Sequence, residues 1–276
     1  MTGVLAFLGV TAIGGLAQMV DGSLGMGFGV FASSLMIATG SAPAVAVAVV
    51  NSAKIFTGLA SGLSHWSLGN VRRDWLWPMV IGGVLGGFLG GYLLTSIPSG
   101  TAKPWVSLLL LVMGLLIVWR AIRWRVPCAI QPWDDKCKNC PQGKWQWLTD
   151  QAKNNAKGRL GILGFVAALV NGLSGAYGPI ATSGVLLIEK GHPREAIGTV
   201  NLVEVAVAAT VATTILVRQG LGQFPIGFVL ALTIGGIITA PLAAYVCRHL
   251  PAKLLAFLVG SALIGLNFRI VTWVIH

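Results

Sequence analysis

Seven polar or charged side chains interrupt stretches of sequence that are otherwise apolar, and they are the first candidates for chemistry. They are Gln18, Asp21, Asn51, Lys54, Asn171, Asn201 and Glu204. If the apolar stretches cross a lipid bilayer, a charge at the helix centre is disfavoured by about 2.5–3.5 kcal/mol on insertion scales, so a functional role is the default interpretation. Asn51 stands three residues before Lys54, which places both on one face of a helix. The same spacing separates Asn201 from Glu204.

These two pairs occupy equivalent places in an internal repeat. A shift of 150 positions aligns residues 14–51 with residues 164–201 without a gap. The aligned identities include Gly14 with Gly164, Val20 with Val170, Gly22 with Gly172, Gly25 with Gly175, Ser33 with Ser183, Pro43 with Pro193 and Asn51 with Asn201. A shift of 153 then aligns Ile81, Gly82 and Gly83 with Ile234, Gly235 and Gly236. Duplicated membrane halves that are broken at glycine or proline are typical of secondary transporters.

Lys54 of the first half corresponds to Glu204 of the second. If a two-fold axis relates the halves, the two helix faces can meet near the centre of the protein, and we predict an ion pair or a shared binding site there. The alternative is a structural ion pair that only holds helices together. Burial favours a protonated carboxyl group, whereas a nearby ammonium group favours the ionised form. A moving substrate could switch between these influences, so Glu204 and Asp21 are candidates to carry a coupling proton.

Two glycine-rich interruptions, residues 21–29 and 171–179, supply the second part of a candidate site. Glycine favours unwinding, and Pro179 suits the first turn of a new helix. The half-helices that follow would present unpaired N–H groups and the positive end of the helix dipole, which bind anions. The candidate substrate-binding residues are Gly22, Ser23, Gly25, Gly27, Asn51, Lys54, Asn171, Gly172, Ser174, Gly175, Asn201 and Glu204. The alternative role of the small residues is close packing of helices.

Composition indicates an integral membrane protein. Hydrophobic residues make up 55% of the chain and charged residues 10%, with a mean hydropathy of +0.80, whereas soluble domains carry about 25% charged residues. We predict spans at residues 44–65, 78–97, 104–123, 194–217, 224–247 and 252–275. Residues 106–118 are apolar on every face, unlike the alternating strands of a barrel. The predicted fold is an all-α polytopic membrane protein, in which each half has a glycine-broken helical hairpin plus three transmembrane helices.

The formal net charge of +11 is explained by topology. Nine of the 19 Lys and Arg residues lie in residues 120–159, and most of the others flank apolar spans. We therefore expect a cytoplasmic loop at residues 120–159 and no nucleic-acid partner. We divide the chain into a first membrane repeat (1–123), a basic Cys-containing cytoplasmic loop (124–158) and a second membrane repeat (159–276).

The direction of the two repeats depends on the broken segments. If each is a re-entrant hairpin, the repeats are inverted and Arg72, Arg73, Lys190 and Arg194 share the cytoplasmic side. If each crosses the membrane once, the repeats are parallel and Lys190 and Arg194 lie outside. The positive-inside tendency favours inverted repeats.

The central loop contains Cys128, Cys137 and Cys140. Cys137 and Cys140 form a C-x-x-C unit, which can bind zinc or cycle as a disulfide. Three sulfurs leave a tetrahedral zinc site incomplete, and no histidine of the loop completes it. We therefore predict no cofactor, with these cysteines only as weak metal candidates. A membrane redox or sulfur-transfer protein that uses Cys137 and Cys140 is one competing function, and an anion channel is another.

The chain resembles the TauE/SafE sulfite exporter family. The resemblance lies in the broken glycine-rich segments 22–29 and 171–179, each followed by a proline (Pro43, Pro193) and then an asparagine (Asn51, Asn201). It covers nearly the whole chain apart from residues 124–158. The resemblance implies a transporter rather than an enzyme, one that moves small sulfur-containing anions such as sulfite or organosulfonates across a bacterial inner membrane. The expected partners are that anion, the lipid bilayer and, as a candidate assembly, a second copy of the chain. The residues fit export and import equally.

Overall fold

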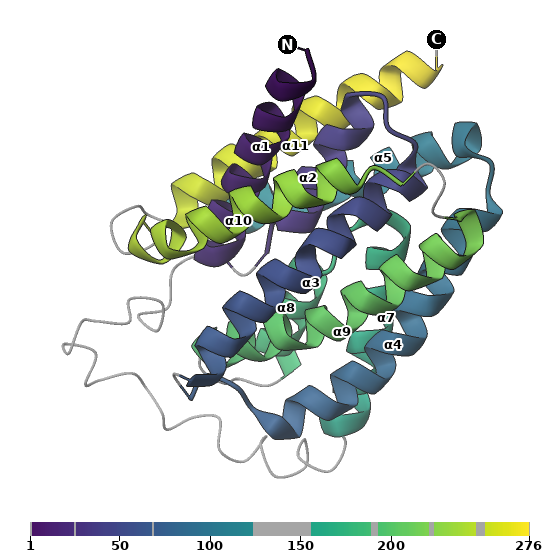
Figure 1. Cartoon of the computed structure of the whole chain (residues 1–276). Coiled ribbons are helices and arrows are strands. Elements are labelled where there is room, and N and C mark those ends of the chain that lie inside the picture. Colours follow the sequence, from purple (N-terminus) through teal and green to yellow (C-terminus); the bar gives the residue numbers. More distant parts are fainter. Residues whose placement is uncertain are drawn as a thin grey trace.

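The computed structural model describes residues 2–24, 26–67, 69–123, 156–188, 193–220, 224–246 and 252–275. The helices are α1 (Thr2–Leu24), α2 (Phe28–Ala38), α3 (Pro43–Ser67), α4 (Arg73–Ser96), α5 (Ser99–Arg123), α7 (Ala156–Ser174), α8 (Gly178–Ile188), α9 (Pro193–Gln219), α10 (Ile226–Val246) and α11 (Ala252–Ile275). Every regular element within the described ranges is an α-helix, which confirms the predicted all-α class (Figure 1). Each predicted span overlaps one of these helices.

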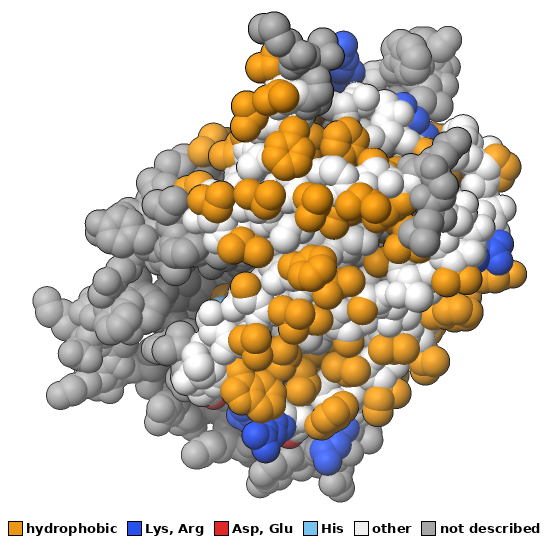
Figure 2. Space-filling model, viewed as in Figure 1, with side chains coloured by type: hydrophobic (Ala, Val, Ile, Leu, Met, Phe, Trp, Pro, Cys, Tyr) orange, Lys and Arg blue, Asp and Glu red, His pale blue; other side chains and the backbone are white. Residues whose placement is uncertain are grey.

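The surface is suited to lipid. Helices α3, α4 and α9 and residues Ser99–Trp119 of α5 are long and apolar enough to cross a membrane, among the described residues. Trp77, Ile81, Leu85 and Phe88 of α4 are all more than half exposed and recur every three or four residues, so they form one outward-facing stripe. Figure 2 shows hydrophobic side chains over the middle of the visible face, with Lys and Arg near its edges. The chain is thus a multi-pass membrane protein.

Helices of one repeat pack mainly on helices of the other. Helix α4 of the first repeat packs against α7 of the second. The equivalent helices, α10 of the second repeat and α1 of the first, pack in the same way. Helix α3 packs against α9, and α5 packs against α11. The two halves therefore interlock as one unit, as Figure 1 shows for the α3, α9, α4 and α7 layer.

Equivalent glycines make equivalent contacts at these crossings. Gly82 of α4 lies against the carbonyl oxygen of Gly161 on α7. Gly235, its counterpart on α10, lies against the carbonyl oxygen of Thr11 on α1. A Cβ atom at either glycine would overlap that oxygen, so glycine allows the two backbones to touch. The repeat seen in the sequence is thus also a repeat of contacts.

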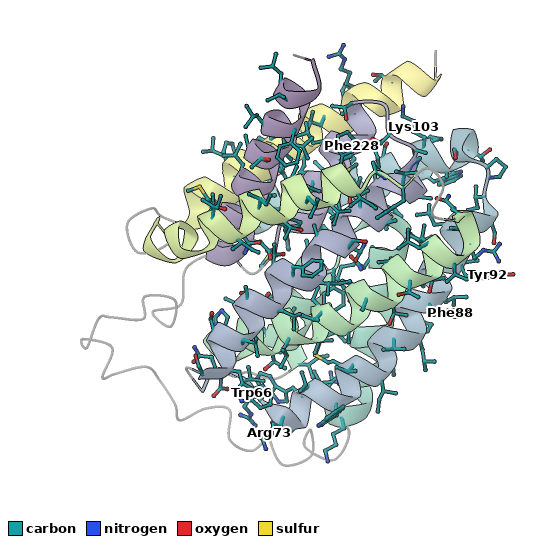
Figure 3. All side chains as sticks on the ribbon, in the orientation of Figure 1. Trp66, Arg73, Phe88, Tyr92, Lys103 and Phe228 are labelled. Carbon is teal, nitrogen blue, oxygen red and sulfur yellow. The ribbon has the colours of Figure 1, made fainter. Side chains whose placement is uncertain are left out.

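Charged contacts mark the two ends of the helix bundle. The guanidinium of Arg72, between α3 and α4, lies 3.6 Å from the carboxylate of Glu195 at the start of α9. The backbone N–H of Arg72 also donates to Thr199 Oγ1 at 2.9 Å. At the other end of α9, Arg218 Nε donates to Thr95 Oγ1 of α4 at 2.8 Å. Figure 3 shows Trp66 and Arg73 at one end of the molecule and Lys103 at the other.

Candidate functional site

The two helix breaks are shorter than predicted. Helix α1 continues to Leu24 and α7 to Ser174, and the non-helical residues described between the half-helices are 26–27 and 175–177. Gly25 lies outside the described residues. The expectation that the backbone is unwound from residue 21 and from residue 171 is wrong. Backbone pairing explains the difference, because an unpaired N–H or C=O group in a bilayer costs several kcal/mol. The N–H of Gly175, for example, still donates to the carbonyl of Asn171 at 2.7 Å.

Four of the predicted binding residues therefore lie in helices and not in the breaks. Gly22 and Ser23 lie in the last turn of α1, and Gly172 and Ser174 lie in the last turn of α7. Gly172 lies against the backbone of Gly90 and Gly91 on α4, which is a packing contact. Ser174 Oγ donates to the carbonyl of Val170 at 2.9 Å, so this hydroxyl is bound within its own helix.

The two breaks meet in the interior. Gly29, in the first turn of α2, lies against the carbonyl oxygen of Gly175 in the second break. Gly175 has a φ of 82°, in the left-handed region that favours glycine. Met26, Phe28, Ala176 and Tyr177 are all buried. In Figure 1, α2 runs back toward the end of the molecule at which α1 begins, so the first break is the tip of a hairpin.

The predicted ion pair between Lys54 and Glu204 is confirmed. Lys54 Nζ of α3 pairs with Glu204 Oε1 of α9, and each residue is only 4% exposed. The pair also lies beside the breaks, since a Cβ atom on Gly29 would be 3.1 Å from Lys54 Nζ. Attraction in a low-dielectric interior offsets the desolvation of such a pair only when both partners are present. Cation, anion and both helix breaks therefore share one site.

Asp21 is the third charged group of this site. Its Oδ1 accepts the backbone N–H of Phe28 at 3.2 Å, and the side chain is buried. The carboxylate thus occupies the N-terminal end of α2, where the helix dipole favours negative charge. The charges of Asp21 and Lys54 both act on Glu204. With two carboxylates and one ammonium group ionised, the cluster carries a formal charge of −1.

The asparagines separate into two environments. Asn51 Nδ2 donates to the carbonyl of Val47 at 2.8 Å, and Asn51 Oδ1 accepts Asn171 Nδ2 at 2.8 Å. Asn201, the counterpart of Asn51, instead donates to Ser61 Oγ at 2.9 Å. The structure therefore connects Asn51 and Asn171 to each other, whereas the Asn201 side chain is bound to α3.

Three buried polar atoms of these segments have no hydrogen-bond partner. They are Ser33 Oγ, Asn171 Oδ1 and the Tyr177 hydroxyl. A buried polar group without a partner costs about 1–3 kcal/mol, so each of them calls for an explanation. The repeat alignment pairs Ser33 with Ser183, but neither Ser33 nor Tyr177 is among the binding residues predicted from the sequence. A signal for Tyr177 was available, because it is an aromatic residue in a glycine-rich break and aligns with Gly27 of the other repeat.

Two hollows lie near this site, and neither contains the ion pair. One, of about 500 Å³, separates α5 from α8; we call it the α5–α8 groove. It is lined by Met26, Met113, Leu116, Ile117, Trp119, Leu163, Pro179, Ile180, Ser183, Gly184, Leu186 and Leu187. The other, of about 640 Å³, lies between α4 and α9 beside Phe88, Tyr92 and Arg218. Neither is lined by Lys54 or Glu204, so the ion pair is enclosed by protein.

The structure does not test the predicted metal candidates, because Cys128, Cys137 and Cys140 lie outside the described residues. Within the described ranges, no group of three His, Cys, Asp or Glu side chains is placed to hold a metal ion.

Fold and site together define a class, that of polytopic helical membrane proteins whose two interlocked halves bring broken helices to a buried ion pair. The family model "Sulfite exporter TauE/SafE" matches residues 10–270, and the chain therefore belongs to this family of membrane transporters. The chain is also 35% identical over 267 residues to the probable membrane transporter protein YtnM of Bacillus subtilis strain 168. That alignment covers 96% of this chain and 81% of the relative. No solved structure matches the chain.

Proposed function

We propose that this protein is a secondary transporter, not an enzyme, that exports small sulfur-containing anions such as sulfite or organosulfonates across a bacterial inner membrane. The substrate site lies between the two repeats, near the middle of the bilayer. One observation carries this proposal: both helix breaks meet beside the buried pair of Lys54 and Glu204. Buried charge inside a membrane protein is costly and marks ion or substrate pathways.

The geometry supports an anionic substrate. Helices α2 and α8 begin at Phe28 and Gly178, directly after the breaks, so their N-terminal dipole ends point into the centre of the protein. The N-cap residue of α2 is Gly27, which has no side chain to cap the helix. Lys54 supplies the positive charge. In the structure, the Asp21 carboxylate accepts the backbone N–H of Phe28. An entering anion would replace this carboxylate as the acceptor at the N-terminus of α2.

We further propose that the repeats are inverted and that transport proceeds by alternating access. The contact between Arg72 and Glu195 supports this arrangement, because it brings the α3–α4 connection and the start of α9 to the same end of the bundle. Parallel repeats would separate these two segments by the membrane. The basic end that includes Arg72 and Arg73 is then the cytoplasmic end.

Proton coupling is the third part of the proposal. An anion that enters a cluster of formal charge −1 meets two carboxylates and one ammonium group. Nearby like charge favours protonation of a carboxylate, so anion binding draws a proton onto Glu204 or Asp21. Transport with the Glu204→Gln variant is expected to lose the pH dependence that this proton provides.

Flux measurements in proteoliposomes test the proposal. Purified protein is reconstituted, and efflux of sulfite, sulfoacetate and thiosulfate is compared with and without a proton gradient. Saturable, gradient-dependent flux of at least one anion is expected, and flux of none of them would overturn the proposal. The double variant Cys137→Ser with Cys140→Ser should keep its flux. If it loses the flux while remaining folded, the redox or sulfur-transfer function is favoured instead.

A further inference from the structure

We propose that the site selects a singly charged oxyanion that carries one O–H group, with Tyr177 and Ser33 as hydrogen-bond donors and Asn171 as the acceptor. This inference rests on the proposed transport function and names the substrate class of the same site. Hydrogen sulfite belongs to this class. A sulfonate has the same charge but lacks the O–H group, and sulfite in its fully deprotonated form is a dianion.

The acceptor is defined by a chain of hydrogen bonds. Asn51 Nδ2 donates to the carbonyl of Val47, which leaves Asn51 Oδ1 as an acceptor. Asn171 must therefore present its Nδ2 group to Asn51, and it does so at 2.8 Å. The amide orientation of Asn171 is fixed as a result, and its Oδ1 is the atom left buried without a partner. A carbonyl oxygen in that position requires a donor, which a fully deprotonated anion cannot provide.

The two donors are hydroxyl groups of residues that lie at or next to the meeting point of the breaks. Ser33 of α2 lies against Gly175, and the buried Tyr177 follows Gly175 by two residues. Tyr177 also lies within range of the charge of Glu204. Both hydroxyls are buried without a hydrogen-bond partner. Hydroxyl groups that face an oxyanion can donate to its oxygens, and such charge-assisted bonds are stronger than neutral ones.

Charge gives an independent argument for a monoanion. The ionisable groups at the site are Asp21 of α1, Lys54 of α3, Tyr177 of the second break and Glu204 of α9. Their formal charge of −1 repels a dianion twice as strongly as a monoanion at the same distance. A substrate that brings its own proton meets a smaller electrostatic barrier, and that proton also satisfies the Asn171 oxygen.

Transport by the full-length protein in proteoliposomes tests this inference. Flux of hydrogen sulfite is compared with flux of methanesulfonate at a slightly acidic pH, where both are monoanions. The wild-type protein is expected to reach half-saturation at an at least tenfold lower concentration of hydrogen sulfite. Tyr177→Phe is expected to raise the half-saturating concentration of both anions about tenfold or more, since a hydrogen bond to a charged group is lost. Tyr92→Phe is the matched control, because Tyr92 is exposed beside Arg218 and should leave both values unchanged.

Asn171→Ala separates the acceptor from the donors. It is expected to reduce the preference for hydrogen sulfite while methanesulfonate flux persists. If this variant does not fold, the wild-type comparison of the two anions still decides. Equal half-saturation of the wild type by both anions, or normal values for Tyr177→Phe, would overturn the inference while the transport function stands. Absence of flux for every anion would instead overturn the proposed function and this inference with it.

Discussion

The two repeats share a scaffold but bring different side chains to the site. Asp21 of the first repeat corresponds to Asn171 of the second, and Lys54 corresponds to Glu204. The crossings of α4 with α7 and of α10 with α1 nevertheless use equivalent glycines. Duplication thus supplies the geometry that brings two breaks together, and divergence at a few positions supplies the charges. We propose that the asymmetry in charge, not the symmetry of the backbone, makes the centre a binding site.

The repeats also differ in how their short helices pack. Helix α2 packs against α11, where Asn267 Nδ2 donates to Ser34 Oγ at 2.9 Å. Between the two repeats, α8 corresponds to α2, and α5 corresponds to α11. The α5–α8 groove of about 500 Å³ separates α8 from α5. One half-helix is therefore closed on its neighbour while the other has room beside it. We propose that exchange of these two arrangements is the motion by which the protein alternates its access to the two sides of the membrane.

The largest effect is expected from locking α2 to α11. In a variant whose four native cysteines are replaced, Ser34→Cys and Asn267→Cys are joined by a disulfide or a short thiol-bridging reagent. Transport should stop on cross-linking and return when a disulfide is reduced, because α2 can no longer leave α11. Reversal by reductant is the internal control for folding. Full flux through the cross-linked protein would show that this packing difference has no part in transport.

Removal of one charge should be next in size. Lys54→Met leaves Glu204 buried without its partner, which should cost about 3–5 kcal/mol of stability. The double variant Lys54→Met with Glu204→Met should recover most of that loss, because no uncompensated charge is left. Thermal unfolding in detergent checks the stabilities, and neither variant should transport anions. A double variant as unstable as the single one would contradict the importance of charge pairing between the repeats.

A smaller effect is expected from the backbone of the breaks. Gly175→Ala should cost about 2 kcal/mol, because φ is 82° there and an added Cβ meets Ser33 Oγ. Gly27 is the matched control in the first break, since its φ of 165° is open to any residue. An added Cβ at Gly27 would lie 2.5 Å from Val20 Cγ1 and 3.3 Å from Val20 Cβ, so this variant has a side-chain clash without the left-handed φ. Equal losses of thermal stability for the two alanine variants would contradict this difference between the breaks.

The smallest effect should come from making the first repeat resemble the second at Asp21. Asp21→Asn keeps an oxygen that can accept the Phe28 N–H but raises the formal charge of the cluster from −1 to zero. One unit charge at roughly 10 Å and an effective dielectric constant of 20 is worth about 1.7 kcal/mol. The half-saturating anion concentration should therefore fall about tenfold, and the pH dependence of flux should weaken. Weaker anion binding would show that Asp21 assists the substrate.

Much of this architecture follows from the sequence. The repeat predicted that positions 54 and 204 would meet, because a two-fold axis between the halves would bring equivalent helix faces together. Hydropathy located the long helices, since each needs a run of apolar residues to cross the bilayer. The length of the breaks did not follow, because glycine only permits unwinding, whereas backbone pairing kept Gly22 and Gly172 helical.

Other features needed the three-dimensional structure. An unpartnered hydroxyl such as that of Tyr177 can be recognised only when all its neighbours are known. Helices α2 and α8 are aligned in the sequence repeat, so the sequence pattern could not predict that they pack differently. Gly172 was predicted as a binding residue from its place in a glycine-rich run. Its packing role became visible only from its contact with Gly90 and Gly91 in the structure.

The position of a bound anion would show whether the substrate binds where the two helix breaks meet. A crystal structure of the protein grown with hydrogen selenite, measured at the selenium absorption edge, would locate the anion by its anomalous signal. A selenium peak is expected where Gly29 and Gly175 meet, within contact distance of Lys54 Nζ and the Tyr177 hydroxyl. A peak only in the hollow between α4 and α9 beside Arg218, in a protein that still transports the anion, would contradict this expectation.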